Sequence, residues 1–389
     1  MTQPKGKAAD LKFNENGKFR IMQIADIQDT QYTSKNTIKF IEAALDKAQP
    51  DLVVFTGDQI KGYGISLLQG DRDSNIFKAI SNFLTPLTDR DIPFTFVFGN
   101  HDDQAFGITK EKQFQMYKSF DGCLAEIGDE TIDGYANHYI NIEASKEEKT
   151  AFNLYLIDSL SMSMDGFSNP VSEGQLNWYR DVRDFLKEEN GEYVPSMVFQ
   201  HIPVPEVWEL LKEVPKGTKP SAPGYRDHAD KFYWMKDETL VKGNYDFVLE
   251  TPATPVTNGG EFDALSEKGD TIAIFFGHDH NNSFVGKYKN MLLGYTQGCG
   301  FNVYGPDLNR GVRVIDLDET NPSTISTHTI MYKDLFKKED IDEKLKFTYY
   351  KYGPTSFESV EPIIKKGIIA AAVTAGVLVG AKIIKTILK

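Results

Sequence analysis

The stretch "DLVVFTGD" (residues 51–58) is an apolar run that ends in a polar turn. The stretches "FRIMQIAD" (19–26) and "PFTFVFGNHD" (93–102) repeat this design on either side of it. Apolar runs of this length, bounded by turn residues, are typical of strands buried on both faces. The three stretches therefore predict three interior strands of a sheet.

The segments between these strands have helical periodicity. Residues 34–50 carry apolar side chains at helical spacing, with Ser34 as a candidate N-cap and Pro50 after the end. Residues 73–87 follow the same pattern. The order strand, helix, strand, helix, strand predicts an α/β fold with a parallel sheet.

The rest of the chain continues the α/β pattern and then departs from it. We predict a helix at 172–189 with a capping box of Ser172 and Gln175, and further strands at 151–158, 196–201, 271–278 and 311–318. Residues 203–269 are rich in proline, glycine and charge, which indicates an irregular insertion. Loops of this kind over strand ends often shape pockets, so we expect substrate specificity to arise there.

Composition excludes some classes of function. The net charge of −13 over 389 residues leaves no basic surface for general nucleic-acid binding. The two cysteines, Cys123 and Cys299, indicate neither a disulfide framework nor a thiolate metal site. The polar N-terminus does not resemble a secretion signal, so we expect an intracellular protein on the cytoplasmic side.

The C-terminal region has a different character. We expect one folded domain over residues 1–335, a charged linker over 336–361 and a hydrophobic tail over 362–389. The tail contains an uncharged run at 367–381 that is apolar on every side of a helix and shorter than the ~20 residues that span a bilayer. We predict that the tail associates with a membrane; a helix docked on the domain and an interfacial helix are the alternatives.

Metal-capable side chains follow five of the predicted strands. They are Asp26 with Gln28, Asp58, Asn100 with His101, His201, and His278 with His280. Each alone is an ordinary turn or cap residue, but strand carboxyl ends are where open α/β sheets gather their ligands. Oxygen and imidazole ligands without thiolate suit Mn, Fe or Zn, and the set suffices for two ions. Two ions ~4 Å apart bind the oxygens of a phosphoryl group and attract an anionic substrate to an acidic chain.

The motifs "ADIQD", "TGDQ", "GNHDD", "FQHIPVPE" and "FGHDHNN" together resemble the calcineurin-like metallophosphoesterases, over about residues 19–330. "GNHDD", "HIPVPE" and "GHDHNN" are most similar to small fungal and plant phosphatases related to purple acid phosphatase. This resemblance implies a four-layer α/β/β/α sandwich of two mixed sheets flanked by helices, with a dinuclear metal centre at one rim.

The resemblance also implies roles for individual residues. One ion would be held by Asp26, Gln28, Asp58 and His280, and the other by Asp58, Asn100, His201 and His278, so that Asp58 bridges them. His101 would face the scissile phosphate and protonate the leaving oxygen. Asp102 or Asp103 would orient His101, or would only hold its loop.

Two positions depart from the family pattern. Gln28 stands where the family most often has histidine, which favours Mn or Mg over Zn. This pattern also resembles the manganese-dependent diphosphatases of ADP-ribose and CDP-alcohols; alternatively it marks an impaired centre. Lys61 stands where purple acid phosphatases carry tyrosine, so no tyrosinate-to-iron colour is expected.

Our leading hypothesis is hydrolysis of a phosphomonoester by in-line attack of a metal-bound hydroxide. The substrate would be a phosphorylated small molecule or a phosphoprotein. Hydrolysis of a nucleotide-type diphosphate or phosphodiester is the second reading, and a non-catalytic, membrane-tethered binding module is the third. In the insertion, His228 and Arg226 are candidate substrate contacts, whereas His138 and His328 are expected to be structural or exposed.

Overall fold

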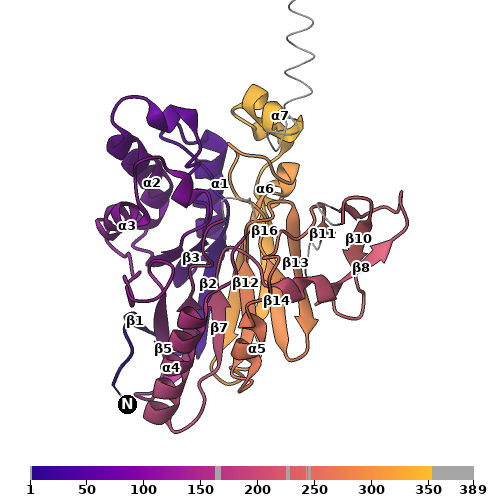
Figure 1. Ribbon diagram of the computed structural model, residues 1–389. Coiled ribbons are helices and arrows are strands. Elements are labelled where there is room, and N and C mark those ends of the chain that lie inside the picture. The colour runs from indigo at the N-terminus through magenta and orange to yellow at the C-terminus, as the bar shows by residue number, and fades with distance from the viewer. Residues whose placement is uncertain (1, 163–167, 225–227, 242, 244–246, 353–389) are drawn as a thin grey trace, which may run out of the picture.

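The three strands predicted first lie side by side in a five-stranded sheet (Figure 1). The computed structural model describes residues 2–352 except 163–167, 225–227, 242 and 244–246. Strands β2 (Lys18–Ile24), β3 (Leu52–Thr56) and β4 (Phe94–Val97) are parallel, as predicted. Strands β15 (Gly311–Asp318) and β16 (Ser326–Met331) extend the sheet antiparallel, in the order β16-β15-β2-β3-β4.

A second sheet of eight strands has the order β1-β5-β6-β7-β12-β14-β13-β11. The predicted strands in it are β6 (Thr150–Leu156), β7 (Ser196–Phe199) and β12 (Thr271–Phe276). The other strands are β1 (Lys7–Lys12), β5 (His138–Glu143), β11 (Phe247–Val248), β13 (Asn282–Tyr288) and β14 (Met291–Tyr295). Both parallel and antiparallel pairs occur, so the sheet is mixed.

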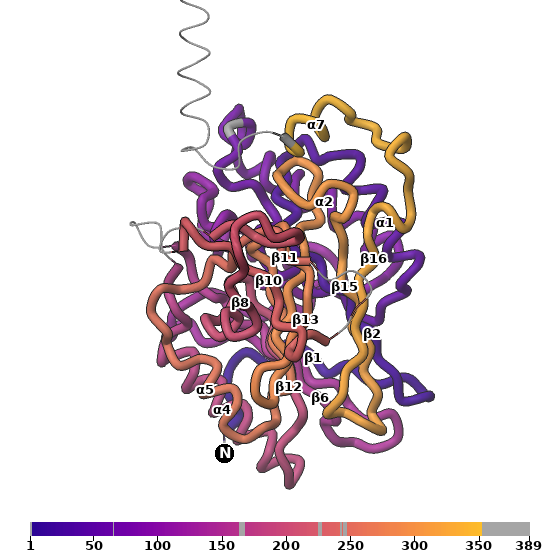
Figure 2. Tube along the Cα trace, turned by 90° about the vertical axis from the view of Figure 1, so that its right-hand side faces the viewer, coloured from indigo at the N-terminus to yellow at the C-terminus, as the bar shows by residue number. Residues whose placement is uncertain are grey.

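Helices cover the outer faces of the two sheets (Figures 1 and 2). Apolar residues of α1 (Lys35–Ala48), α2 (Arg72–Thr88) and α3 (Lys110–Lys118) share one core with the five-stranded sheet. Residues of α4 (Glu173–Asn190) and α5 (Glu261–Ser266) share another with the eight-stranded sheet. A third core lies between the sheets. The predicted four-layer α/β/β/α sandwich is confirmed.

Alternation along the central strands builds these cores. On β3, Val53 and Phe55 face the helices, whereas Leu52 and Val54 face the other sheet. Because successive strand side chains point to opposite faces, an uninterrupted apolar run fills two cores at once. This explains why the stretch 51–58 has no polar face.

The segment 203–269 is more regular than predicted. It contains η3 (Pro205–Leu210) and a small sheet of β8 (Leu211–Val214), β10 (Phe232–Met235) and β9 (Ala222–Pro223), which stands at one side of the sandwich in Figure 1. Val207, Leu210 and Met235 anchor it in the core of the eight-stranded sheet. Strands this short lack a visible period, so the prediction of an irregular insertion was wrong for these elements.

The segment after β16 packs on the domain where a linker was expected. It forms α6 (Tyr332–Leu335), η6 (Lys338–Asp340) and α7 (Lys344–Tyr352). Phe347 is buried against Phe301, with ring centroids 6.0 Å apart. The expected boundary at residue 335 therefore falls inside a packed segment, because a few buried apolar residues lie among the charges. No helix within the described part of the chain is long and apolar enough to cross a membrane; the tail at 362–389 lies outside it.

Candidate metal centre

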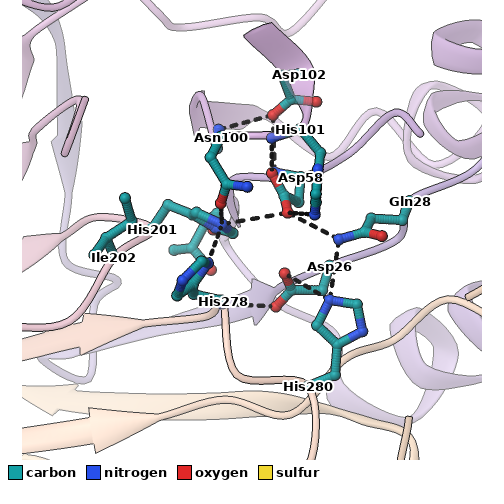
Figure 3. A network of polar contacts seen from close by, with 12 residues as sticks. Asp26, Gln28, Asp58, Asn100, His101, Asp102, His201, Ile202, His278 and His280 are labelled. Atoms are coloured by element: carbon teal, nitrogen blue, oxygen red, sulfur yellow. Dashed lines mark hydrogen bonds and ion pairs between the residues drawn. The ribbon is translucent and has the colours of Figure 1, made fainter. Parts of the chain in front are cut away.

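All seven predicted metal ligands lie at the carboxyl ends of five strands and converge on one place (Figure 3). They follow β2 (Asp26, Gln28), β3 (Asp58), β4 (Asn100), β7 (His201) and β12 (His278, His280). The first three of these strands belong to one sheet and the last two to the other. The centre therefore sits at the rim where the two sheets meet.

The backbone at this rim is strained. Asp26, Gln28, Asp58 and His278 have positive φ values of 53°, 40°, 54° and 72°. Non-glycine residues rarely adopt such values, and they gather where function requires an unusual backbone path. Close packing adds a second constraint, because a Cβ on Gly99 would lie 2.2 Å from Oδ1 of Asp58.

One half of the centre is built around His201. Its Nδ1–H donates to the carbonyl of Thr56 at 2.9 Å, so a neutral ring presents a lone pair on Nε2. This Nε2 lies 3.4 Å from Oδ2 of Asp58, 3.1 Å from Oδ1 of Asn100 and 3.2 Å from Nδ1 of His278. When the ring is neutral, Nε2 and the two oxygens are acceptors that face one another, so either a proton on Nε2 or a bound cation is needed to hold them together.

The other half is built around His280. Its ring stacks on Tyr304 with centroids 4.2 Å apart, and its Nδ1–H donates to the Tyr304 carbonyl at 2.9 Å. Nε2 then faces Oδ1 of Asp26 at 3.4 Å, a buried oxygen with no hydrogen-bond partner. Asp26, Asp58 and His280 each place a ligand atom within 4.8 Å of the others. This donor set also fits a cation.

Electrostatics at the centre favour positive charge. Burial opposes protonation of His201, but the carboxylate of Asp58 outweighs it and raises the pKa of His201 to about 10. Burial would raise the pKa of Asp58, yet His201 and His101 hold it below its usual range. Burial and the neighbouring His201 keep the pKa of His278 well below its usual value, so its ring stays neutral. The negative charge that holds a proton on His201 can hold the positive charge of a metal ion in its place.

Gln28 lies where predicted, but its amide is turned the other way. Nε2 donates to Oδ2 of Asp58 at 2.8 Å and lies 3.0 Å from Nε2 of His280, whereas Oε1 accepts from the hydroxyl of Tyr63 at 3.0 Å. Coordination requires the amide oxygen to face inward. In that orientation the Tyr63 hydroxyl can accept a hydrogen bond from the amide nitrogen, so Tyr63 can hold the Gln28 amide in either orientation.

His101 is positioned beside the centre rather than in it. Its backbone N–H donates to Oδ1 of Asp58 at 2.7 Å, and its Nε2 lies 3.9 Å from Oδ2. Nδ1–H donates to Oε1 of Gln104 at 2.8 Å, and the ring packs against Tyr63 with centroids 4.7 Å apart. Gln104, which the sequence did not single out, thus orients the imidazole so that Nε2 faces the centre.

Asp102 does not orient His101, which corrects the predicted role. Its carboxylate accepts three backbone N–H groups, from Asp58 and Gly99 at 2.8 Å and from Ile60 at 2.9 Å. Asp103 accepts instead from the hydroxyl of Ser161. The geometry supports the alternative, in which Asp102 holds the loops that follow β3 and β4.

A hollow of about 530 Å³ opens beside the centre and is lined by His101, His278 and His280 among others. His228 also lines it and stacks on Trp208, with centroids 4.4 Å apart. The predicted contact His228 is therefore at the hollow, whereas Arg226 lies outside the described residues. Sequence reasoning missed Trp208 and also Glu250, which is held by the hydroxyl of Tyr304 at 2.8 Å.

The two remaining histidines are structural. His138 is buried on β5, where its Nδ1 donates to the Ala136 carbonyl at 2.7 Å and its Nε2 lies 2.6 Å from the Thr95 hydroxyl. His328 lies half-buried on β16. Neither approaches the centre, as expected.

Comparison with known proteins agrees with this geometry. Residues 19–282 match the family model of calcineurin-like phosphoesterases. The chain is 27% identical over 343 residues to probable inactive purple acid phosphatase 14 of Arabidopsis thaliana, an alignment that covers 79% of this chain and 77% of that one. It is 29% identical over 237 residues to phosphatase DCR2 of Saccharomyces cerevisiae, covering 54% and 39% respectively.

Among solved structures, the chain resembles a dimetal phosphatase from Danio rerio, with a TM-score of 0.47 and 14% identity over 81% of this chain and 99% of that one. The family match covers more than half of the chain and all seven residues of the candidate centre. The chain therefore belongs to the calcineurin-like phosphoesterases, hydrolases that act on phosphoric esters with a dinuclear centre of divalent metal ions.

Proposed function

We propose that this chain hydrolyses a phosphomonoester with two divalent metal ions bound at the rim of the sandwich. The supporting observation is the cluster of potential metal ligands in which Nε2 of His201 lies within 3.4 Å of Asp58, Asn100 and His278. When bound, two such ions supply the positive charge and Lewis acidity that an acidic chain otherwise lacks.

Asp58 would bridge the two ions. Its Oδ2 lies between the halves of the centre, 2.8 Å from Nε2 of Gln28 and 3.4 Å from Nε2 of His201. Asp26, Gln28 and His280 would complete one site, and Asn100, His201 and His278 the other. An amide oxygen from Gln28 favours manganese, with iron and zinc as alternatives.

His101 would serve the leaving group. Gln104 holds Nδ1–H at 2.8 Å, so Nε2 is the atom that can carry a proton toward the departing alcohol. The ring is part of the wall of the 530 Å³ hollow, where the organic part of the substrate would lie. Trp208 and His228, stacked at 4.4 Å, offer that part a flat aromatic surface.

The test is turnover by the full chain with Mn²⁺ on p-nitrophenyl phosphate, bis(p-nitrophenyl) phosphate and ADP-ribose. We expect the monoester to react fastest, and Asp58→Asn to lose at least ~100-fold in kcat/KM because an ion-bridging group is gone. Asp103→Asn, an exposed neighbour outside the centre, is the matched control. Equal rates for Asp58→Asn and the parent would overturn the proposal.

Two other functions have specific support. Gln28 favours a nucleotide-type diphosphate or phosphodiester, and faster turnover of ADP-ribose or the bis-ester than of the monoester would select that function. The word "inactive" in the name of the Arabidopsis relative favours a non-catalytic binding module. Absence of turnover on all three substrates with metal bound would select that function.

A further inference from the structure

A second hollow, of about 420 Å³, has Tyr63 in its wall, and the ring of Tyr63 packs against His101, which lines the first hollow. Tyr63 is part of its wall, and the same side chain touches His101 by its ring and Gln28 by its hydroxyl. One residue therefore separates the second hollow from both the metal ligands and the expected acid. A ligand in this hollow would lie one side chain away from the reacting phosphate.

The two hollows differ in charge. Lys61 and Lys346 line the second hollow, and no carboxylate is among its described lining residues. The first hollow is lined by Glu250 and Asp279, and none of its described lining residues is a lysine or arginine. In a chain with net charge −13, two lysines gathered beside the centre form a local exception. Such a local field attracts an anion in spite of the overall charge.

Lys61 is the more unusual of the two lysines. Its Nζ donates to the carbonyl of Asn302 at 2.9 Å and to the hydroxyl of Tyr350 at 3.3 Å, and lies over the rings of Tyr63 and Tyr350 at 5.2 and 4.6 Å. In the described structure no carboxylate lies within ion-pairing distance of it. Burial lowers its pKa to about 8. The buried carboxylate of Asp29 opposes this lowering from beyond ion-pairing distance, but the hydrogen-bond partners of the ammonium are neutral, so charge remains for a ligand to balance.

The opposite wall comes from the C-terminal segment. Lys346 and Tyr350 belong to α7, which Phe347 anchors to the core, so the hollow exists only because this helix docks. Lys346 makes one long contact, 3.4 Å from Oε1 of Glu343, and keeps other N–H donors. Hydroxyls of Thr30 and Ser66 line the same space and add hydrogen-bonding groups.

We infer that the second hollow is a subsite for a second anionic group, phosphate or carboxylate, carried by the substrate whose phosphomonoester is cleaved at the metal centre. This inference rests on the proposed function. The reacting phosphate would lie at the metals and the second anion between Lys61 and Lys346, so that the part of the substrate joining them would pass Tyr63. The substrate class is thus a bisphosphorylated small molecule or a phosphorylated acid.

The experiment compares two inhibitors that differ by one phosphate, fructose 6-phosphate and fructose 1,6-bisphosphate. Their inhibition constants are measured against p-nitrophenyl phosphate with the full Mn²⁺-loaded chain. We expect the bisphosphate to bind at least ~10-fold more tightly, and this ratio to fall to about 2 in Lys61→Met and in Lys346→Met. Lys344→Met, an exposed lysine on the same helix, is the matched control and should keep the parent ratio.

A parent ratio near 1, or an unchanged ratio in both Lys61→Met and Lys346→Met, would overturn the subsite. Taking the ratio within each variant cancels a general loss of active protein. If the parent does not cleave p-nitrophenyl phosphate, the proposed function fails on its own, and calorimetric affinities for the two sugar phosphates replace the inhibition constants. Equal calorimetric affinities overturn the subsite, and a Lys61-dependent difference supports it as a binding site for a bis-anion.

Discussion

Asp102→Ala should act mainly on stability, because the Asp102 carboxylate satisfies three backbone donors and does not touch His101. The three hydrogen bonds, from Asp58, Gly99 and Ile60, are 2.8 to 2.9 Å long and buried. A buried donor left without a partner costs about 1 kcal/mol or more. We therefore expect the free energy of unfolding to fall by about 3 kcal/mol. Burying this carboxylate is itself unfavourable, since burial raises the pKa of Asp102 to about 7. Its removal therefore offsets part of the stability lost with the three hydrogen bonds.

The assay is urea unfolding of parent and variant, followed by kcat and KM of the folded fractions. Asp103→Ala is the control, since this exposed neighbour accepts from the hydroxyl of Ser161 and from no other group in the described part of the chain, and should change stability by less than about 1 kcal/mol. Asp102→Ala with parental stability, and a kcat at least ~100-fold lower whose pH profile is altered, would refute this reasoning. That result would restore Asp102 as the residue that orients His101.

Three further expectations follow from single contacts. Tyr63→Phe removes the hydroxyl that holds Gln28 at 3.0 Å but keeps the ring, so one of two Mn²⁺ affinities measured by calorimetry should weaken by roughly 10-fold or more; two unchanged affinities would contradict this. Gln104→Ala frees the ring of His101, so kcat for an ester with a poor leaving group should fall further than kcat for p-nitrophenyl phosphate; equal losses would count against the acid role. Burial lowers the pKa of His138 to about 4, so the stability of the neutral ring is present above about pH 6.5 and lost as pH falls to about 4. Between pH 6.5 and pH 4 the free energy of unfolding should therefore fall by less in His138→Asn than in the parent, with a difference on the order of 3 kcal/mol, as measured by urea unfolding at each pH.

The interior of the fold could be predicted because its strands are apolar on both faces. The run at 51–58 fills two cores, and Ser34 and Ser172 cap the helices that follow the pattern. Strands such as β8 and β9 are too short to show a period. The segment leading to α7 is dominated by charge, and its few anchors, such as Phe347, are visible only once their partners are known.

The candidate ligands could be predicted because each follows a recognisable strand and all share one edge. The side chains that position these ligands could not be predicted. Gln104 is in the loop beside His101, but nothing in the sequence favours it over Asp102 or Asp103 as the partner of that ring. Tyr63 reaches Gln28 through the path of a loop, which no spacing rule describes.

The central claim, two metal ions that share Asp58, is tested most directly by counting bound manganese. Parent and Asp58→Asn are loaded with Mn²⁺, separated from free metal and analysed for metal per chain. We expect about two ions in the parent and at most one in Asp58→Asn, because the substitution removes a ligand common to both sites. A parent that binds no metal, or an Asp58→Asn variant that still binds two ions, would contradict the claim.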